Sequence, residues 1–127
     1  MVRLAANLSM MFQDLPFLDR FDAAARAGFT GVEFMFPYDH EAGLIAERAK
    51  RCGLDIVLFN LPPGDWAGGE RGLGALPDRV EECRAGARLA RDYARALGCP
   101  RLHLMAGKLP VTPESHQALV ENLGYAA

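Results

Sequence analysis

The sequence predicts an α/β fold in which parallel strands lie in the order 1-2-3-4, with a helix after each strand. Extended apolar segments alternate with segments of helical spacing along the 127 residues. Three segments also align without gaps, each beginning at a glycine that ends a helix and continuing into a strand: GFTGVEFMFP from Gly28, GLDIVLFNLP from Gly53 and GCPRLHLMAG from Gly98. A strand–helix unit that repeats with short turns gives parallel strands joined by right-handed crossovers.

Each element is expected from its local pattern. The strands are short apolar runs, at 4–9, 31–36, 56–60 and 102–105. The helices are expected at 14–27, 40–52, 77–97 and from residue 112 onwards. Asp14 can cap the first helix with Pro16 in its first turn, and Thr112 and Pro113 open the last one in the same way.

Composition excludes several classes of protein. Half of the residues are hydrophobic, which is enough for a packed core. The net charge is −2 with both signs mixed along the chain, so neither a nucleic acid nor a membrane is expected as a partner. No apolar stretch approaches the ~20 residues that span a bilayer, and the N-terminus is a poor signal peptide. Three widely spaced cysteines without a CxxC pair indicate reduced thiols in a cytoplasmic protein.

The length fits one domain covering residues 1–127. Four strand–helix units are present, and the fourth helix reaches Ala127 without a stop signal. An eightfold barrel needs about 250 residues. The pattern therefore leaves two alternatives, which are a fragment of a (β/α)8 barrel and a complete four-stranded open sheet.

The aligned repeats also predict which side of the sheet each strand residue faces, because successive residues point to opposite sides. One side carries the polar groups and is expected to be the inner side: Glu33, Leu58, His103, Met35, Asn60 and Met105. The other side is uniformly apolar and is expected to pack against helices: Val32, Phe34, Val57, Phe59, Leu102 and Leu104. Asn7, near the end of the first strand, is expected to join the inner side.

Four polar residues on the inner side are candidates for a binding site: Asn7, Glu33, Asn60 and His103. They fall in the C-terminal parts of their strands, where parallel α/β folds carry their active sites. Glu33 is the strongest signal, because a carboxylate inside an apolar strand is costly unless it is paired or used. The two asparagines equally suit the capping of strand ends, and His103 equally suits a hydrogen-bonded core histidine.

A long glycine-rich segment, NLPPGDWAGGERGLGALP, follows the third strand at residues 60–77. Loops of this length inside compact domains are often binding loops or lids. Trp66 offers an apolar face that can cover a pocket, and the Arg71 guanidinium suits a carboxylate. The alternative is a mobile solvated loop with a surface ion pair. The glycine spacing matches no phosphate-binding motif.

Several segments resemble the hydroxypyruvate isomerase family. NLSMMFQDLPFLDRFDAAARAGFTGVEFMFPY is similar to the opening of that family, NLPPGDWAGGERGLGALPDR to its long third loop, and LHLMAG to its fourth strand. The resemblance covers essentially the whole chain. It implies the N-terminal half of a (β/α)8 TIM barrel of the xylose-isomerase-like superfamily, truncated in the fourth helix.

The resemblance implies a cytoplasmic enzyme that interconverts hydroxypyruvate and tartronate semialdehyde, or a related 2-oxo-tetronate pair. A proton would move between adjacent carbons through an enediol(ate), which needs a carboxylate base and positive charge on the oxyanion. Mg²⁺ or Mn²⁺ supplies that charge well. The family's catalytic glutamates and metal ligands lie on later strands. This chain alone is therefore expected to bind no metal, to hold no catalytic residue and to be inactive.

The substrate-facing residues can be carried over from the resemblance. Arg71 is the candidate for the substrate carboxylate, and Trp66 is a further candidate for substrate binding. The candidate pocket walls are Asn7, Glu33, Asn60 and His103. The expected partner is a small hydroxy-keto acid, together with self-association through the open edges of the sheet. Two other functions are kept open: a different sugar epimerase of the same superfamily, and a non-catalytic half-barrel that pairs with another chain.

Overall fold

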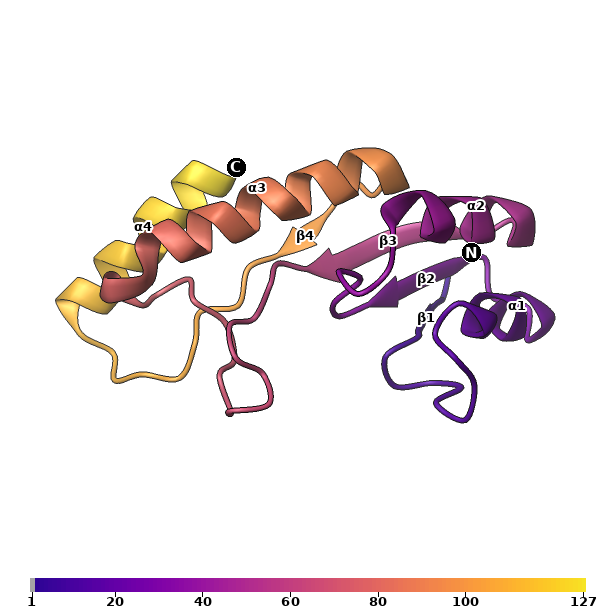
Figure 1. Ribbon diagram of the computed structural model, residues 1–127, viewed down its shortest axis with the longest axis horizontal. Helices are drawn as coiled ribbons and strands as arrows, with labels where there is room; N and C mark the ends of the chain where they lie inside the picture. Colours follow the sequence, from indigo (N-terminus) through magenta and orange to yellow (C-terminus); the bar gives the residue numbers. More distant parts are fainter. Residues whose placement is uncertain (1) are drawn as a thin grey trace. The chain divides into compact units, whose positions relative to one another are not determined.

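The computed structural model describes residues 2–127 (Figure 1). One sheet holds four strands in the order β1-β2-β3-β4, and the pairs β1–β2 and β2–β3 are parallel. This confirms the predicted strand order. The strands are β1 (Ala5–Asn7), β2 (Gly31–Phe34), β3 (Asp55–Asn60) and β4 (Leu102–His103). The helices are α1 (Asp19–Arg26), α2 (Ala42–Cys52), α3 (Val80–Leu97) and α4 (Pro113–Ala126), and the 3-10 turn η1 (Pro77–Arg79) leads into α3.

The chain forms two compact units. The first unit comprises Met1–Phe59 and Tyr93–Leu102, and the second comprises Asn60–Asp92 and His103–Ala127. The first therefore contains β1, β2, most of β3, α1 and α2. The second contains the long loop after β3, most of α3, and α4. Within residues 2–127, no helix is both long and apolar enough to cross a bilayer.

The core of the first unit is built on aromatic rings and aliphatic side chains. Phe21, Val32, Ile45 and Phe59 are fully or almost fully buried. Phe34 stacks on Phe59 with ring centroids 6.0 Å apart. Val32 and Phe34 therefore lie on the packed side of β2, as the alternation of its residues predicts.

The register between β2 and β3 corrects the prediction for Val57. Val32 is paired with Ile56, and Glu33 is paired with Leu58, so the register shifts by one residue at Val57. A Cβ on Gly31 would lie 3.3 Å from Cγ1 of Val57, which puts Val57 on the Gly31 and Glu33 side of the sheet. Ile56, only 5% exposed, takes the place on the packed side that was expected for Val57. The cause is a β-bulge, in which one strand carries an extra residue.

The first two helices begin later than predicted. Residues before α1 form turns, in which the Asp19 N–H donates to the Pro16 carbonyl and no side chain caps the helix, so Asp14 is not its N-cap. Glu41 has an extended backbone, which makes Ala42 and not His40 the start of α2. Arg48 of α2 pairs with Asp19 and Asp22 of α1, at 3.1 and 2.8 Å. These ion pairs join the two helices on their polar sides.

Strand β4 is shorter than the predicted 102–105, and Leu102 is 36% exposed. The backbone after His103 pairs with the long loop instead. Gly74 N–H donates to the Met105 carbonyl at 3.0 Å, and Ala75 N–H donates to the Ala106 carbonyl at 2.8 Å. The carbonyls expected to continue β4 are thereby occupied by residues 74–75 of the loop.

Helix α4 begins as predicted, with Thr112 as its N-cap. Its side chain accepts from the Ser115 N–H, and Ser115 Oγ accepts from the Thr112 N–H, which is a capping box. Within the second unit α4 runs beside the first turns of α3 (Figure 1), where Arg88 of α3 donates to the Tyr125 hydroxyl at 2.7 Å. The α3 helix is found where it was predicted, except that its first turn is the 3-10 turn η1.

Candidate functional site

The first unit brings two of the predicted residues together. Asn7 ends β1, and its Nδ2 donates to Oε1 of Glu33 on β2 at 3.0 Å. The Oδ1 of Asn7 accepts from the Ser9 N–H at 3.0 Å, so both ends of the amide are bonded. Asn7 and Glu33 are direct partners in the β1–β2 register, which explains why their side chains share one side of the sheet.

Glu33 also borders a groove of about 410 Å³ in the first unit. The other charged residues at this groove are Arg3 and Arg101. Arg3 is paired with Asp55 at 2.6 Å, and Arg101 donates to the Val57 carbonyl at 3.4 Å. The side of the sheet that was predicted to be polar therefore does carry charge.

The second unit brings together the other two predicted wall residues. The Nδ1 atom of His103 lies 3.2 Å from Oδ1 of Asn60. The Nδ2 of Asn60 donates to the thioether of Met105 at 3.8 Å, and Asn60 is only 8% exposed. Asn60, His103 and Met105 thus share one side, as the aligned repeats predict. The histidine tautomer decides whether Nδ1 donates or accepts, and with Nδ1–H donating, Nε2 becomes an acceptor.

Arg71 and Trp66 form a stacked pair in the long loop. The guanidinium carbon of Arg71 lies 3.8 Å from the centroid of the Trp66 ring. One guanidinium nitrogen, Nη1, donates to the carbonyls of Trp66 and Glu70, at 3.1 and 2.6 Å. Among residues 2–127, no carboxylate lies within ion-pair distance of Arg71. The cation is therefore held in place without being neutralised.

Glu70, the neighbour of Arg71, is fully engaged elsewhere. Its carboxylate accepts from Arg79 at 2.6 and 3.3 Å and from the Asp65 N–H. The Arg79 guanidinium and then the Asp65 amide lower the pKa of Glu70. Arg79 also binds Glu82 at 2.7 and 2.9 Å, which lowers the pKa of that carboxyl as well. Two carboxylates therefore compete for Arg79, and neither is left over for Arg71.

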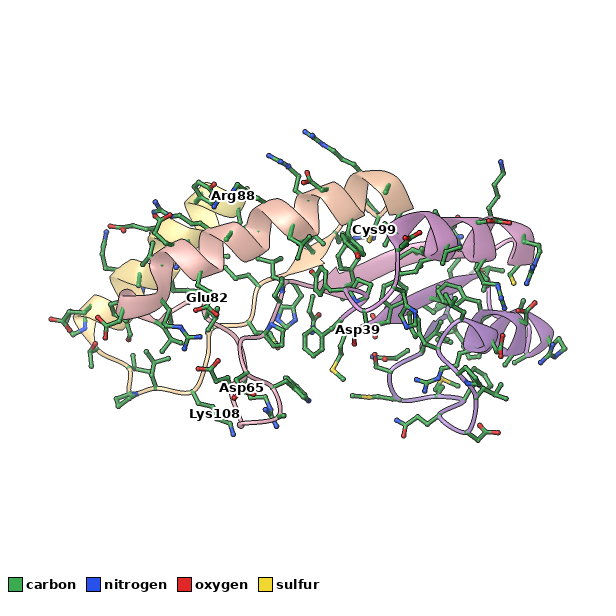
Figure 2. All side chains as sticks on the ribbon, in the orientation of Figure 1. Asp39, Asp65, Glu82, Arg88, Cys99 and Lys108 are labelled. Atoms are coloured by element: carbon green, nitrogen blue, oxygen red, sulfur yellow. The ribbon has the colours of Figure 1, made fainter. Side chains whose placement is uncertain are left out.

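A groove of about 390 Å³ borders this loop, with Arg71, Lys108 and the glycines at 68–69 among its lining residues. Figure 2 shows Lys108 beside the tip of the loop that carries Asp65. Asp65 is turned into the loop, where it accepts from the Gly68 N–H at 2.8 Å. The groove therefore presents Arg71 and Lys108 to a ligand, and its other charged lining residues are Glu70, Asp78 and Arg79.

Some contacts elsewhere in the first unit were not expected from the sequence. The Tyr93 hydroxyl donates to the His40 carbonyl at 2.8 Å, and Tyr38 packs edge-on against Tyr93. Burial raises the pKa of Tyr38, so this phenol stays protonated. Tyr38 lies in the FPY segment of the sequence, and Tyr93 lies on α3.

Comparison with known proteins places this geometry in a family. Residues 21–127 match the family model described as xylose isomerase-like TIM barrel. The chain is 51% identical to a 2-oxo-tetronate isomerase of Pectobacterium atrosepticum and 48% identical to the hydroxypyruvate isomerase of Escherichia coli K12. All of this chain and 50% of each relative are covered, so the chain spans about half the length of the curated relatives it matches.

Solved structures agree with the fold. A crystal structure described as an AP endonuclease, family 2, from Brucella melitensis superposes with a TM-score of 0.96 at 50% identity. That match covers 99% of this chain and 50% of the other one. A sugar phosphate isomerase/epimerase from Parabacteroides distasonis has the same fold, with a TM-score of 0.67 at 15% identity over 98% of this chain and 46% of that chain. The chain belongs to the xylose isomerase-like TIM barrel family.

Proposed function

We propose that this chain serves, in a complete barrel, as the substrate-binding half of an isomerase of small hydroxy-keto acids. The substrate would be hydroxypyruvate or a 2-oxo-tetronate, isomerised through an enediol(ate). The proposal is supported by the names of the relatives at 48–51% identity, which are 2-oxo-tetronate isomerase and hydroxypyruvate isomerase. It is also supported by the chemistry of the long loop, which suits a carboxylate.

The observation that carries the proposal is the state of Arg71. Its guanidinium is stacked on Trp66, and one of its nitrogens is fixed by two backbone carbonyls. Within residues 2–127 it has no acidic partner, although Glu70 is adjacent in sequence. A fixed guanidinium without a counter-ion is organised to receive a carboxylate with little loss of conformational freedom.

The second unit, which carries Arg71, also holds a polar pair that suits the remainder of such a substrate: Asn60 and His103, whose donor and acceptor atoms lie 3.2 Å apart. In the first unit, Asn7 and Glu33 form a pair of the same kind, 3.0 Å apart. Groups of this kind can orient hydroxyl and carbonyl oxygens. We assign no proton transfer to them. Among residues 2–127, no three His, Cys, Asp or Glu side chains gather in a way that could hold a metal ion.

Other functions of the same family fit these residues less well. A neutral sugar, the substrate class of many epimerases, would leave Arg71 without a role. The Brucella protein is described as an AP endonuclease, but this chain has a net charge of −2 and no basic run that would bind a phosphate backbone. The isomerase of an anionic substrate therefore remains the function that the loop supports best.

A role in pairing with another chain has one specific observation in its favour. Among residues 2–127, β1 pairs only with β2, and Val2 and Leu4 beside it are 82% and 66% exposed. An open strand edge next to exposed apolar side chains favours addition of another strand. Light scattering on the purified chain would support this role if the chain is a dimer or larger, and a monomer would contradict it.

We also propose a cytoplasmic location. Cys52, Cys83 and Cys99 are all free, and burial raises the pKa of each thiol. Free thiols that stay protonated fit a reducing compartment. Fractionation of cells that produce the protein would test this, and recovery in an extracellular or periplasmic fraction would contradict it.

The single tryptophan provides a direct test of the binding role. D-glycerate has the carboxylate of the proposed substrate but no ketone, and glycerol replaces that carboxylate by an alcohol. We expect D-glycerate, but not glycerol, to change Trp66 fluorescence on titration. Arg71→Gln should weaken D-glycerate binding about tenfold or more, because hydrogen bonds to charged groups are worth ~1.5–3 kcal/mol.

Arg26→Gln is the matched control, because Arg26 is exposed and its substitution removes the same charge from the chain. Equal affinities of the wild type and Arg71→Gln would contradict the carboxylate role. An assay of the 127-residue chain with hydroxypyruvate and Mg²⁺ or Mn²⁺ should show no turnover. Metal-dependent turnover would show that the active site lies within these residues after all.

A further inference from the structure

The backbone that carries Arg71 is fixed against a second segment of the same unit. Gly72 follows Arg71 directly and pairs with Ala106 in an antiparallel bridge. The Gly72 N–H donates to the Pro63 carbonyl at 2.8 Å, and the Gly74 N–H donates to the Met105 carbonyl at 3.0 Å. A Cβ at Gly72 would collide with that carbonyl of Met105. The loop therefore lies against residues 105–106 too closely for any side chain to intervene.

A side chain from α4 also binds the backbone of this loop. The Nδ2 of Asn122 donates to the Gly74 carbonyl at 2.9 Å. Gly74 is three residues beyond Arg71, so both of its backbone groups are bonded, the N–H to Met105 and the carbonyl to Asn122. Asn122 is 2% exposed, and it lies 48 residues from Gly74 in the sequence.

Among the residues that the structure describes, the bond to Gly74 is the one hydrogen bond of the Asn122 amide. Its Oδ1 is buried and accepts no hydrogen bond from the residues that the structure describes. A buried acceptor without a partner costs free energy, whereas replacing Asn122 by an apolar side chain would leave the Gly74 carbonyl without its donor. The presence of an asparagine at this position is therefore best explained by its hydrogen bond to Gly74, which holds the backbone of the long loop in place.

We propose that Asn122 is a positioning residue for the Arg71–Trp66 pair: its bond to Gly74 fixes the loop backbone so that the guanidinium stays stacked and open to an anion. Asn122 does not touch the ligand. Its action runs through Gly74 and Gly72 to Arg71. The part of this inference that concerns the anion rests on the proposed function, whereas the part that concerns stacking does not.

Asn122→Leu tests the inference, with Ala118→Gly as the matched control. Ala118 is 5% exposed and lies one turn earlier on α4, so its replacement by glycine loosens the same helix without touching Gly74. The readouts are the near-ultraviolet circular dichroism of Trp66, its quenching by acrylamide, and the dissociation constant of D-glycerate. All are measured where far-ultraviolet circular dichroism shows each variant to be folded.

Asn122→Leu should shift the Trp66 spectrum and quenching toward those of Arg71→Gln, and should weaken D-glycerate binding about tenfold, the effect typical of residues that support a ligand-binding group. Ala118→Gly should keep the wild-type spectrum and affinity while lowering the melting temperature. A purely structural Asn122 would make the two variants alike, and a wild-type Trp66 spectrum in folded Asn122→Leu overturns the inference.

Asn122→Asp carries the test if the leucine variant does not fold. The aspartate is isosteric, but as a carboxylate it cannot donate to Gly74, whereas the protonated acid can, and burial favours the protonated form. The Trp66 spectrum should therefore move toward that of the wild type as the pH falls, with the wild type measured at each pH. Absence of that recovery overturns the inference. If wild-type protein shows no response to D-glycerate, the proposed function fails, and the spectra still decide the positioning role.

Discussion

Arg79 donates to both carboxylate oxygens of Glu70, at 2.6 and 3.3 Å, and thereby ties the long loop to the turn that starts α3. Glu70 is also bonded to the Asp65 N–H, five residues earlier. The Glu70 carboxylate thus joins the two sides of the loop tip through Asp65 and also binds the tip to Arg79. Because Glu70 is occupied in this way, the neighbouring Arg71 keeps its charge available.

Glu70→Gln should make the stability of the chain less sensitive to acid. The pKa of Glu70 is lowered in the folded protein, chiefly by Arg79. Its contribution is therefore present above the ordinary glutamate pKa of about 4.3 and is lost as the pH falls through the lowered folded value. Urea unfolding between pH 6 and pH 3 should show a steeper loss in the wild type than in the variant.

Glu47→Gln is the control for this prediction. Glu47 is an exposed glutamate of α2, and among residues 2–127 it forms no ion pair. Its replacement should leave the acid dependence of the wild type in place. If Glu70→Gln and Glu47→Gln give the same pH profile, the Glu70–Arg79 pair does not contribute to the stability of the folded chain.

Gly72→Ala should destabilise the chain more than Gly28→Ala does. Both glycines have a positive φ, +106° and +89°, so alanine is strained at each position, at a cost of ~1–2 kcal/mol. At Gly28 a Cβ would meet no atom within 4 Å, whereas at Gly72 it would collide with Met105. The collision should add ~1–3 kcal/mol, the usual effect of overpacking. Thermal unfolding of the two variants gives the comparison, and equal losses would contradict the close approach of the loop to Met105.

Thr112→Ala should cost about 1 kcal/mol of unfolding free energy, because it removes the side chain that accepts from the Ser115 N–H at 3.1 Å. Thr30→Ala is the control, since Thr30 is exposed and precedes β2, and its replacement should change stability by less than ~0.5 kcal/mol. Chemical denaturation measures both. Identical midpoints would mean that the capping box does not stabilise α4 in solution.

Local signals predicted the elements and their order. Gly28, Gly53 and Gly98 all have a positive φ, as the ends of helices require, and Thr112 caps α4. The error at Val57 has a different origin. A gapless alignment of the repeats assumes equal registers, and a bulge of one residue leaves no mark in the sequence. The position of the bulge depends on how β3 pairs with β2, and the sequence pattern of β3 alone does not give that register.

The candidate site divides in the same way. The shared side of Asn60 and His103 follows from strand alternation and could be anticipated. Arg71 and Trp66 were each chosen as site residues, but their stacking was not predicted. Asn122 could not, because its role depends on a contact 48 residues away. The early end of β4 also depends on contacts that are distant in the sequence, because the carbonyls of Met105 and Ala106 accept hydrogen bonds from the long loop.

The pair of Asn7 and Glu33 should show measurable coupling in a double-mutant cycle. The Nδ2 of Asn7 donates to Oε1 of Glu33 at 3.0 Å, and both side chains are only partly buried. A hydrogen bond to a charged group in this setting should give a coupling free energy of about 1 kcal/mol. The cycle consists of Asn7→Ala, Glu33→Ala and the double variant, each unfolded in urea at pH 7.

Glu33→Gln extends this prediction toward function. Its amide oxygen can still accept from Asn7, so stability should change by less than ~1 kcal/mol relative to the wild type. If the hydrogen bond is made in solution, the losses of unfolding free energy in Asn7→Ala and Glu33→Ala should not add up to the loss in the double variant. Losses that add within ~0.3–0.5 kcal/mol would show that the bond is not made in solution. A higher free energy of unfolding in Glu33→Gln than in the wild type would instead show that the Glu33 carboxylate destabilises the fold. Such a residue is typical of a ligand-binding site.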